Sequence, residues 1–152
     1  MSLHLHAGLI ADVFSFNYPA FTKCDAFEIF LGPADEDAYY EFHVTPSNSV
    51  LQLHFDGANP RPLKERMVAQ ALFTSETSRT PEGWHLLARI PLKGLFPTSH
   101  PEWLLSFGRY DHTPGRLKPV ISSTSPHTVC NFHRKEEWRR VRLVELLSMS
   151  LD

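Results

Sequence analysis

The sequence is poor in cysteine and glycine and has no excess of positive charge. Its 152 residues include only 2 cysteines and 7 glycines, and 15 Lys and Arg stand against 17 Asp and Glu, for a net charge of -2. Two cysteines outside any Cys-x-x-Cys pair are too few for a zinc site. A nucleic-acid binder or a membrane-surface protein would show clustered basic residues. The balanced charge therefore predicts neither a nucleic-acid partner nor a membrane partner.

Long hydrophobic runs are also missing. No stretch approaches the roughly 18 apolar residues of a membrane span. The first residues, MSLHLHAGLIADVF, carry histidines where a signal peptide carries lysine or arginine. We therefore expect no signal peptide in this chain, and the start is expected to be flexible. The residues alone leave the compartment unknown.

Short runs of alternating apolar and polar residues recur along the chain. Tyr40, Phe42 and Val44 alternate with Glu41 and His43, which is typical of a strand with one buried face. Twelve prolines scattered between such runs indicate many turns. Eight runs predict one all-β domain over residues 1–152, a sandwich or barrel. They are 27–31, 40–44, 51–55, 68–76, 83–92, 102–111, 118–125 and 139–146.

Two segments allow a helical alternative. The run 139–146 also fits an amphipathic helix through Trp138, Val141 and Val144, but the alternation of Arg140 and Arg142 favours a strand. The stretch 56–67 is predicted as a connection that holds at most one helical turn.

Motifs of the common enzymes and cofactor sites are absent. The sequence has no G-x-S-x-G, no phosphate-binding glycine loop, no H-E-x-x-H and no dinucleotide fingerprint. We expect no catalysis and no cofactor. His43, His54 and His85 on three predicted strands could meet as metal ligands, but scattered surface histidines are the preferred interpretation. The acidic residues 35–37 are likewise taken as a solvated turn rather than a calcium site, so no metal is predicted.

Polar residues suitable for sugar binding recur on the predicted strands. Sugars offer paired hydroxyls and apolar C–H faces, so a sugar site needs carboxylate, amide or guanidinium groups beside flat aromatic rings. The same pattern fits the solvated face of an ordinary sheet, so by itself it does not decide the function. The residues expected to share this face are Glu28, His43, Gln52, His54, Arg89 and Arg109.

The order of seven segments narrows the choice. From about Asp25 to Leu143 the chain runs D-A-F-E-I-F-L-G-P, Y-Y-E-F-H-V-T-P, an apolar strand, a Trp strand ending I-P-L-K-G-L, E-W-L-L-S-F-G-R-Y-D, I-S-S-T-S-P and N-F-H-R-K-E-E-W-R-R-V-R-L. This order resembles the family 9 carbohydrate-binding modules and their DOMON-like relatives. The resemblance implies a β-sandwich of two antiparallel sheets, jelly-roll or immunoglobulin-like, that binds glycan ends or short oligosaccharides without catalysis. Because such modules are commonly attached to extracytoplasmic glycan-degrading enzymes, it also implies that location and context.

The resemblance assigns roles to five positions. Glu28 would accept hydrogen bonds from sugar hydroxyls, and His43 stands where an arginine often bonds the sugar. Phe21 and Phe132 take the places of two aromatic rings that wall a binding slot, and Arg109 matches the arginine of the F-x-R strand. The resemblance also implies that Cys24 and Cys130 lie near disulfide reach, since they sit beside the two ring-bearing segments, and that Trp138 packs the last strand onto the core.

Departures from the family pattern keep two alternatives open. Thr124 stands where the family usually has tryptophan, and both stacking positions are phenylalanine, so stacking is expected to be weaker. The first alternative is a sandwich that serves as a structural or interaction domain after losing sugar binding. The second is a haem-binding DOMON-like domain, for which Met67, Met149 and several histidines are candidate ligands.

Overall fold

The computed structural model describes residues 2–6, 15–57, 60–97 and 99–142. Within these ranges it is nearly all β, and no helix there is long and apolar enough to cross a bilayer. The elements in chain order are β1 (Ser2–His6), η1 (Ala20–Thr22), β2 (Ala26–Pro33), β3 (Tyr39–Val44), β4 (Val50–Phe55), α1 (Leu63–Arg66), β5 (Thr74–Thr80), β6 (Gly83–Arg89), β7 (Glu102–Asp111), β8 (Val120–Ser123), η2 (Lys135–Glu137) and β9 (Arg139–Arg142).

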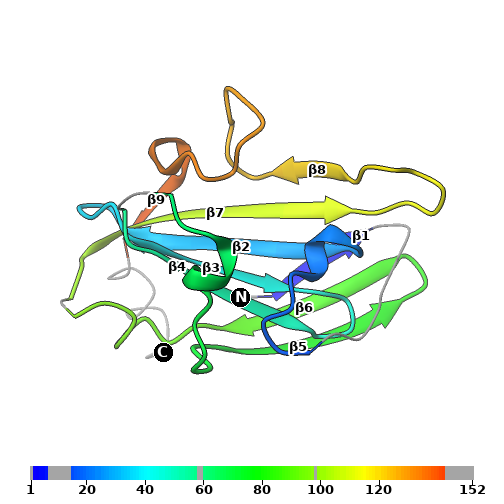
Figure 1. The fold of residues 1–152 in the computed structure, drawn as a ribbon, viewed down its shortest axis with the longest axis horizontal. Coiled ribbons are helices and arrows are strands. Elements are labelled where there is room, and N and C mark those ends of the chain that lie inside the picture. The colour runs from blue at the N-terminus through cyan, green and yellow to red at the C-terminus, as the bar shows by residue number, and fades with distance from the viewer. Residues whose placement is uncertain (1, 7–14, 58–59, 98, 143–152) are drawn as a thin grey trace, which may run out of the picture.

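The strands form two antiparallel sheets, which confirms the predicted sandwich (Figure 1). The smaller sheet has the order β1-β6-β5, and the larger has the order β4-β3-β2-β7-β8. The long strand β7 pairs with two strands along the same edge. Its residues 108–111 pair with β8, and its residues 102–105 pair with β9. The chain between β8 and β9 therefore returns along the larger sheet, from one end of β7 to the other (Figure 1, orange).

The hydrophobic core lies between the two sheets. Alternate residues of each strand point into it, as the period-two patterns predict. Trp84, Leu86 and Ala88 of β6 are buried against the larger sheet. The larger sheet contributes Phe27, Ile29, Leu31, Phe42, Val44 and Trp103.

The opposite face of the larger sheet is also covered, and we call it the outer face. All eight residues of the central strand β2 are buried, which requires cover on both sides. Phe30 points to the outer face and forms a second apolar cluster with Tyr39 and Trp138. Burial of Trp138 at the start of the last strand agrees with its expected packing role.

One expected strand, 68–76, is wrong, because the strand begins only at Thr74. The backbone of the preceding segment bonds instead to a side chain, the fully buried amide of Gln52. Its Nε2 donates to the carbonyls of Val68 and Gln70 at 3.3 and 3.1 Å, and its Oε1 accepts from the N–H of Leu72 at 2.7 Å. These bonds satisfy three backbone groups of the segment in place of a strand partner.

Other local expectations have mixed outcomes. Residues 139–142 form a strand, as favoured over the helix, and 143–146 lie outside the described residues. The connection 56–67 contains the single turn α1. The start is not wholly flexible, since Ser2–His6 pairs with β6 as an edge strand.

Candidate functional site

A recess of about 360 Å³ opens on the outer face of the larger sheet. Its walls come from η1, from strands β2, β3, β4, β7 and β8, from α1 and from the segment before η2. Buried carboxylates, aromatic rings and cationic groups face it together. These residues are Glu28, Glu41, Phe21, Phe55, Tyr110, Phe132, Arg61, Arg66 and His133.

Strand register assembles the floor of the recess. Glu28 of β2 stands opposite His43 of β3 and opposite Gly108 of β7. Glu41 is two residues before His43 and therefore faces the same side. Glu28, Glu41 and His43 are only 2%, 3% and 3% exposed. Three ionisable groups are thus buried side by side where a central strand meets its neighbour.

The imidazole of His43 lies between the two carboxylates. Its Nδ1 is 3.2 Å from Oε1 of Glu28, and its Nε2 bonds Oε1 of Glu41. The second oxygen of Glu41 has no hydrogen-bond partner among the described residues, although His133 Nδ1 lies 3.7 Å away. An acceptor oxygen is therefore left for another donor at the edge of the recess.

Burial and charge shift the pKa values of this group. Burial raises the pKa of Glu28, and His43 opposes the rise only in part. For His43, burial by itself would lower the pKa, but Glu28 and Glu41 together outweigh it and the pKa is raised. The floor therefore holds protons more tightly than its isolated groups would and carries less negative charge than two free carboxylates.

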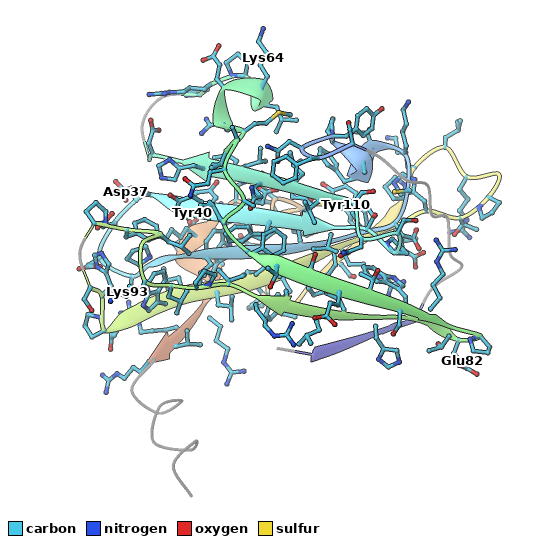
Figure 2. The ribbon with its side chains drawn as sticks, turned by 90° about the horizontal axis from the view of Figure 1, so that it is seen from below. Asp37, Tyr40, Lys64, Glu82, Lys93 and Tyr110 are labelled. Carbon is cyan, nitrogen blue, oxygen red and sulfur yellow. The ribbon has the colours of Figure 1, made fainter. Side chains whose placement is uncertain are left out.

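Aromatic rings stand on two sides of this floor. The Phe21 ring centroid is 5.0 Å from that of His43 and 5.4 Å from that of Tyr110. The Phe132 centroid is 6.1 Å from that of Tyr110, edge to face. The absence of a side chain at Gly108 makes room for Phe132, because a Cβ there would lie 2.8 Å from Phe132 Cδ2. Tyr110, labelled in Figure 2, is thus a neighbour of both predicted stacking rings.

Hydrogen bonds anchor both ring-bearing segments. Trp138 donates through Nε1 to the carbonyl of Phe132 at 2.8 Å. The carbonyl of Phe21 lies 2.9 Å from the ring Nε2 of His112, and the backbone N–H of His112 donates to Asp25 Oδ1 at 2.7 Å. Both ring-bearing segments are therefore bonded to residues that adjoin the larger sheet, Trp138 before β9 and His112 after β7. A site that is ordered before binding loses less conformational entropy when a ligand binds.

Not every expected residue reaches the recess. Phe21, Glu28 and Phe132 line it, and their role in binding stays a prediction. His43 lies beneath the lining rather than in it, with both ring nitrogens directed at carboxylates. It positions Glu28 and Glu41 and is not an open hydrogen-bonding group.

The placement of Arg109 in this site is wrong. Arg109 stands opposite Phe27, a core residue, so its side chain leaves the sheet on the face away from Glu28. Its guanidinium pairs with Asp111 at 2.6 Å. The period of two along β7 sends Gly108 and Tyr110 to the recess and Arg109 to the other side.

The expected polar face is also wrong at three other positions. Gln52 and His54 stand opposite Phe42 and Tyr40, which face the core side. Arg89 belongs to the smaller sheet, where it pairs with Glu76. On β4 the outer-face residues are the apolar ones, including Leu53 and Phe55 of the recess wall.

Several residues of the recess were not anticipated. Glu41 and Tyr110 could have been found from the alternation of their strands. Glu41 is two positions from His43, and Tyr110 is two positions from Gly108, and both of these neighbours stand opposite Glu28. Arg66 and His133 had no such signal, since they lie outside the strands. Figure 2 shows α1, marked by Lys64, beyond the β4 edge of the larger sheet.

The side chains that could ligate a metal ion or haem are not arranged as an open ligand set among the described residues. The ligand atoms of Glu28, Glu41 and His43 lie within 4.8 Å of one another, but both ring nitrogens of His43 are directed at the carboxylates, so an ion would have to displace the imidazole. The possible metal cluster of His43, His54 and His85 does not form. His43 and His54 lie on opposite faces of the larger sheet, and His85 lies on the smaller sheet. Met149 falls outside the described residues.

The two cysteines do not form a disulfide. Cys24 is buried just after η1, and Cys130 is exposed and lines the recess beside Phe132. The expected closeness of their Cα atoms stays a prediction.

A second cavity, of about 810 Å³, is lined by residues 92–97, 99 and 100 and by Trp103. It is larger than the recess, but its lining is mostly apolar. His100 in its wall faces Asp35 Oδ1 at 2.9 Å and Glu36 Oε1 at 3.0 Å. The smaller recess is the better candidate, because it combines acceptors with flat rings.

The buried acidic groups predict that stability falls as the pH rises from about 5 to about 8. Burial raises the pKa of Glu28, and raises that of Asp25 to about 6, while carboxylates raise that of His43. Groups with raised pKa values bind more protons when folded, so their stabilisation is complete at low pH and lost through this window. His54, whose pKa burial lowers, acts in the opposite direction.

Urea unfolding at both pH values checks this expectation. We expect the free energy of unfolding to be lower at pH 8 than at pH 5 by more than about 1.4 kcal/mol, the equivalent of one pKa unit. The difference between the two pH values should be smaller in Glu28→Gln. Stability that rises across the window would contradict the proposed electrostatics.

Comparison with known proteins supports the fold. Neither the known protein-family models nor the curated proteins give a match. A protein from Bacteroides uniformis, described as a candidate carbohydrate-binding protein, has a similar structure with a TM-score of 0.66 at 18% identity, over 93% of this chain and 67% of that one. A family 9 carbohydrate-binding module from Caldicellulosiruptor kristjanssonii gives TM-scores of 0.57 in complex with glucose and 0.55 with cellotriose, at 17% and 16% identity. Both cover 85% of this chain, which spans 63% and 62% of theirs.

The chain therefore has the fold of a family 9 carbohydrate-binding module, as the order of its segments predicts. At identities of 16–18% the likeness is one of fold. Any function must be argued from the recess itself.

Proposed function

We propose that this chain is a single, non-catalytic carbohydrate-binding domain that holds a glycan end or short oligosaccharide in the recess. One observation carries the proposal: buried carboxylates and aromatic rings, from segments far apart in the sequence, face the same open space. The module from Caldicellulosiruptor kristjanssonii, whose fold is similar, has been solved with glucose and with cellotriose.

The recess offers both kinds of contact that a sugar requires. Oxygens of Glu28 and Glu41 accept hydrogen bonds from the hydroxyl groups of a sugar. Phe21, Tyr110 and Phe132 provide apolar surface for the C–H face of a pyranose ring. A volume of about 360 Å³ is near the small end of ligand pockets, which run from roughly 300 to 1,000 Å³. It suits one or two sugar units at a chain end.

The arrangement of the carboxylates argues against glycoside hydrolysis. A glycosidase places two carboxyl groups on either side of the scissile bond, about 5–9 Å apart, with separate acid and base roles. Glu28 and Glu41 instead share one imidazole, and both are buried. They lack the space between them for the reacting bond.

The alternative of a sandwich without a sugar site predicts a filled slot. The space beside Phe21 and Phe132 is open, which favours binding. Attachment to a glycan-degrading enzyme and an extracytoplasmic location stay predictions from the resemblance.

Calorimetric titration of Gly108→Ala tests the proposal. The added methyl would lie 2.8 Å from Phe132 Cδ2 and 3.0 Å from Glu28 Oε2, so the ring must move into the recess. We expect the wild type to bind glucose, cellobiose or cellotriose, and the variant to bind about tenfold more weakly, a loss of about 1.4 kcal/mol.

Ser78→Ala, an exposed change on β5, is the matched control and should bind like the wild type. Flat wild-type titrations with a panel of neutral and acidic sugars at millimolar concentration would reject the proposal. Unchanged affinity in Gly108→Ala would remove the recess as the binding site.

A further inference from the structure

The rim of the recess carries a three-layer stack that ends in an arginine. The Tyr39 and Phe55 rings are nearly parallel, with an interplanar angle of 7° and centroids 4.5 Å apart. The guanidinium carbon of Arg66, at the end of α1, lies 4.3 Å from the centroid of Phe55. A guanidinium over an aromatic face is attracted by the ring quadrupole, so the position of this charge is fixed before any ligand arrives.

Arg66 retains hydrogen-bonding capacity. Its Nε donates to the carbonyl of Arg61 at 3.3 Å. Within the part of the chain that the structure describes, no carboxylate lies within ion-pair distance of its guanidinium, whereas neighbouring Arg61 pairs with Asp56 at 2.7 Å. The two terminal nitrogens of Arg66 therefore remain as donors on the wall of the recess.

The floor does not cancel this positive charge. His43 stands between the buried carboxylates of Glu28 and Glu41 and compensates them locally. The raised pKa values of Glu28 and His43 reduce the negative charge of the floor further. The floor thus offers carboxylate oxygens that can accept hydrogen bonds from sugar hydroxyls. The rim offers the guanidinium of Arg66, beside Phe55, as a donor to an anion.

We propose that the recess prefers an acidic sugar, a uronic acid at the end of a glycan, and that Arg66 binds its carboxylate. This inference rests on the proposed function. A planar guanidinium matches a carboxylate with two parallel hydrogen bonds, which a hydroxyl group cannot reproduce. Because stacking on Phe55 already orients Arg66, little side-chain entropy is lost on binding.

Paired titrations test the preference. Glucose is compared with glucuronic acid and galactose with galacturonic acid at low ionic strength, since each pair differs only at C6. We expect the acid of at least one pair to bind about five- to tenfold more tightly than its neutral partner. Added salt should reduce the difference, because screening weakens a partly exposed charge pair.

Arg66→Met retains most of the side-chain length and apolar surface but removes the charge. It should bind both members of a pair with equal affinity. Arg89→Met is the control, because Arg89 is an exposed arginine of the smaller sheet. It should keep the full preference for the acid.

The outcomes separate this inference from the proposed function. Equal wild-type affinity for acidic and neutral sugars would overturn the role of Arg66 and leave sugar binding intact. A preference that persists in Arg66→Met would also overturn it. Absence of binding by all four sugars would reject the inference, and absence of binding by cellobiose and cellotriose as well would reject the proposed function with it.

Discussion

Replacing His43 with leucine is expected to destabilise the fold by about 3–5 kcal/mol at neutral pH. Leucine fits the space but leaves Glu28 and Glu41, each almost fully buried, without the imidazole between them. Removing one partner of a buried charge cluster exposes the full desolvation cost of the others. Thermal and urea unfolding measure the loss, which corresponds to a decrease of roughly 10 °C in Tm.

A charge-matched variant separates this effect from packing. The triple change His43→Leu, Glu28→Gln and Glu41→Gln removes both carboxylates and should recover at least half of the lost stability. His54→Leu on β4 changes a half-buried histidine on the core side of the same sheet and should cost less than about 1 kcal/mol, because it leaves no buried carboxylate without a partner. A small loss in His43→Leu, or no recovery in the triple variant, would contradict the account of the floor.

The Phe132→Ala substitution is expected to weaken sugar binding about 30-fold or more, the equivalent of about 2 kcal/mol. Phe132 is half-buried, lies against Gly108 and faces the Tyr110 ring edge. Its removal takes away one wall of the recess, whereas Phe30 and Trp138 beneath it remain to hold the fold. Titration calorimetry measures the affinity, and unfolding of the same sample confirms that the domain is folded.

Phe16→Ala provides the comparison for Phe132→Ala. Phe16 is 47% exposed and does not line the recess, so its removal should leave the affinity within twofold. Equal losses in the two variants, or full affinity in Phe132→Ala, would show that binding does not depend on this ring.

The period-two pattern predicted most strands and the two-sheet architecture. It succeeded on β2 and β3 because Phe27, Ile29 and Phe42 all face a continuous apolar core. It assigned β4 to the wrong side because the larger sheet is covered on both faces. Leu53 and Gln52 are both fully buried, on opposite sides, so hydrophobicity alone does not show which side is the core.

The site was predictable where it depends on strand alternation and not where it depends on loops. Glu28 and Phe132 were named from the order of segments, and both border the recess. The error at Arg109 was avoidable, since it follows the core residue Phe107 by two positions and must share its face. Arg66 could not have been found, because tertiary contacts, among them the bridge between Met67 and Leu53, bring the end of α1 to β4.

The central claim is that Glu28 and Phe132 border the site where a sugar binds. Titration of ¹⁵N-labelled protein with neutral and acidic sugars, followed by two-dimensional NMR, tests it most directly. We expect the largest amide shifts at Glu28, Glu41, Gly108 and Phe132, with those of the 92–100 segment unchanged. Shifts confined to that second cavity, or no shifts at millimolar sugar, would contradict the account.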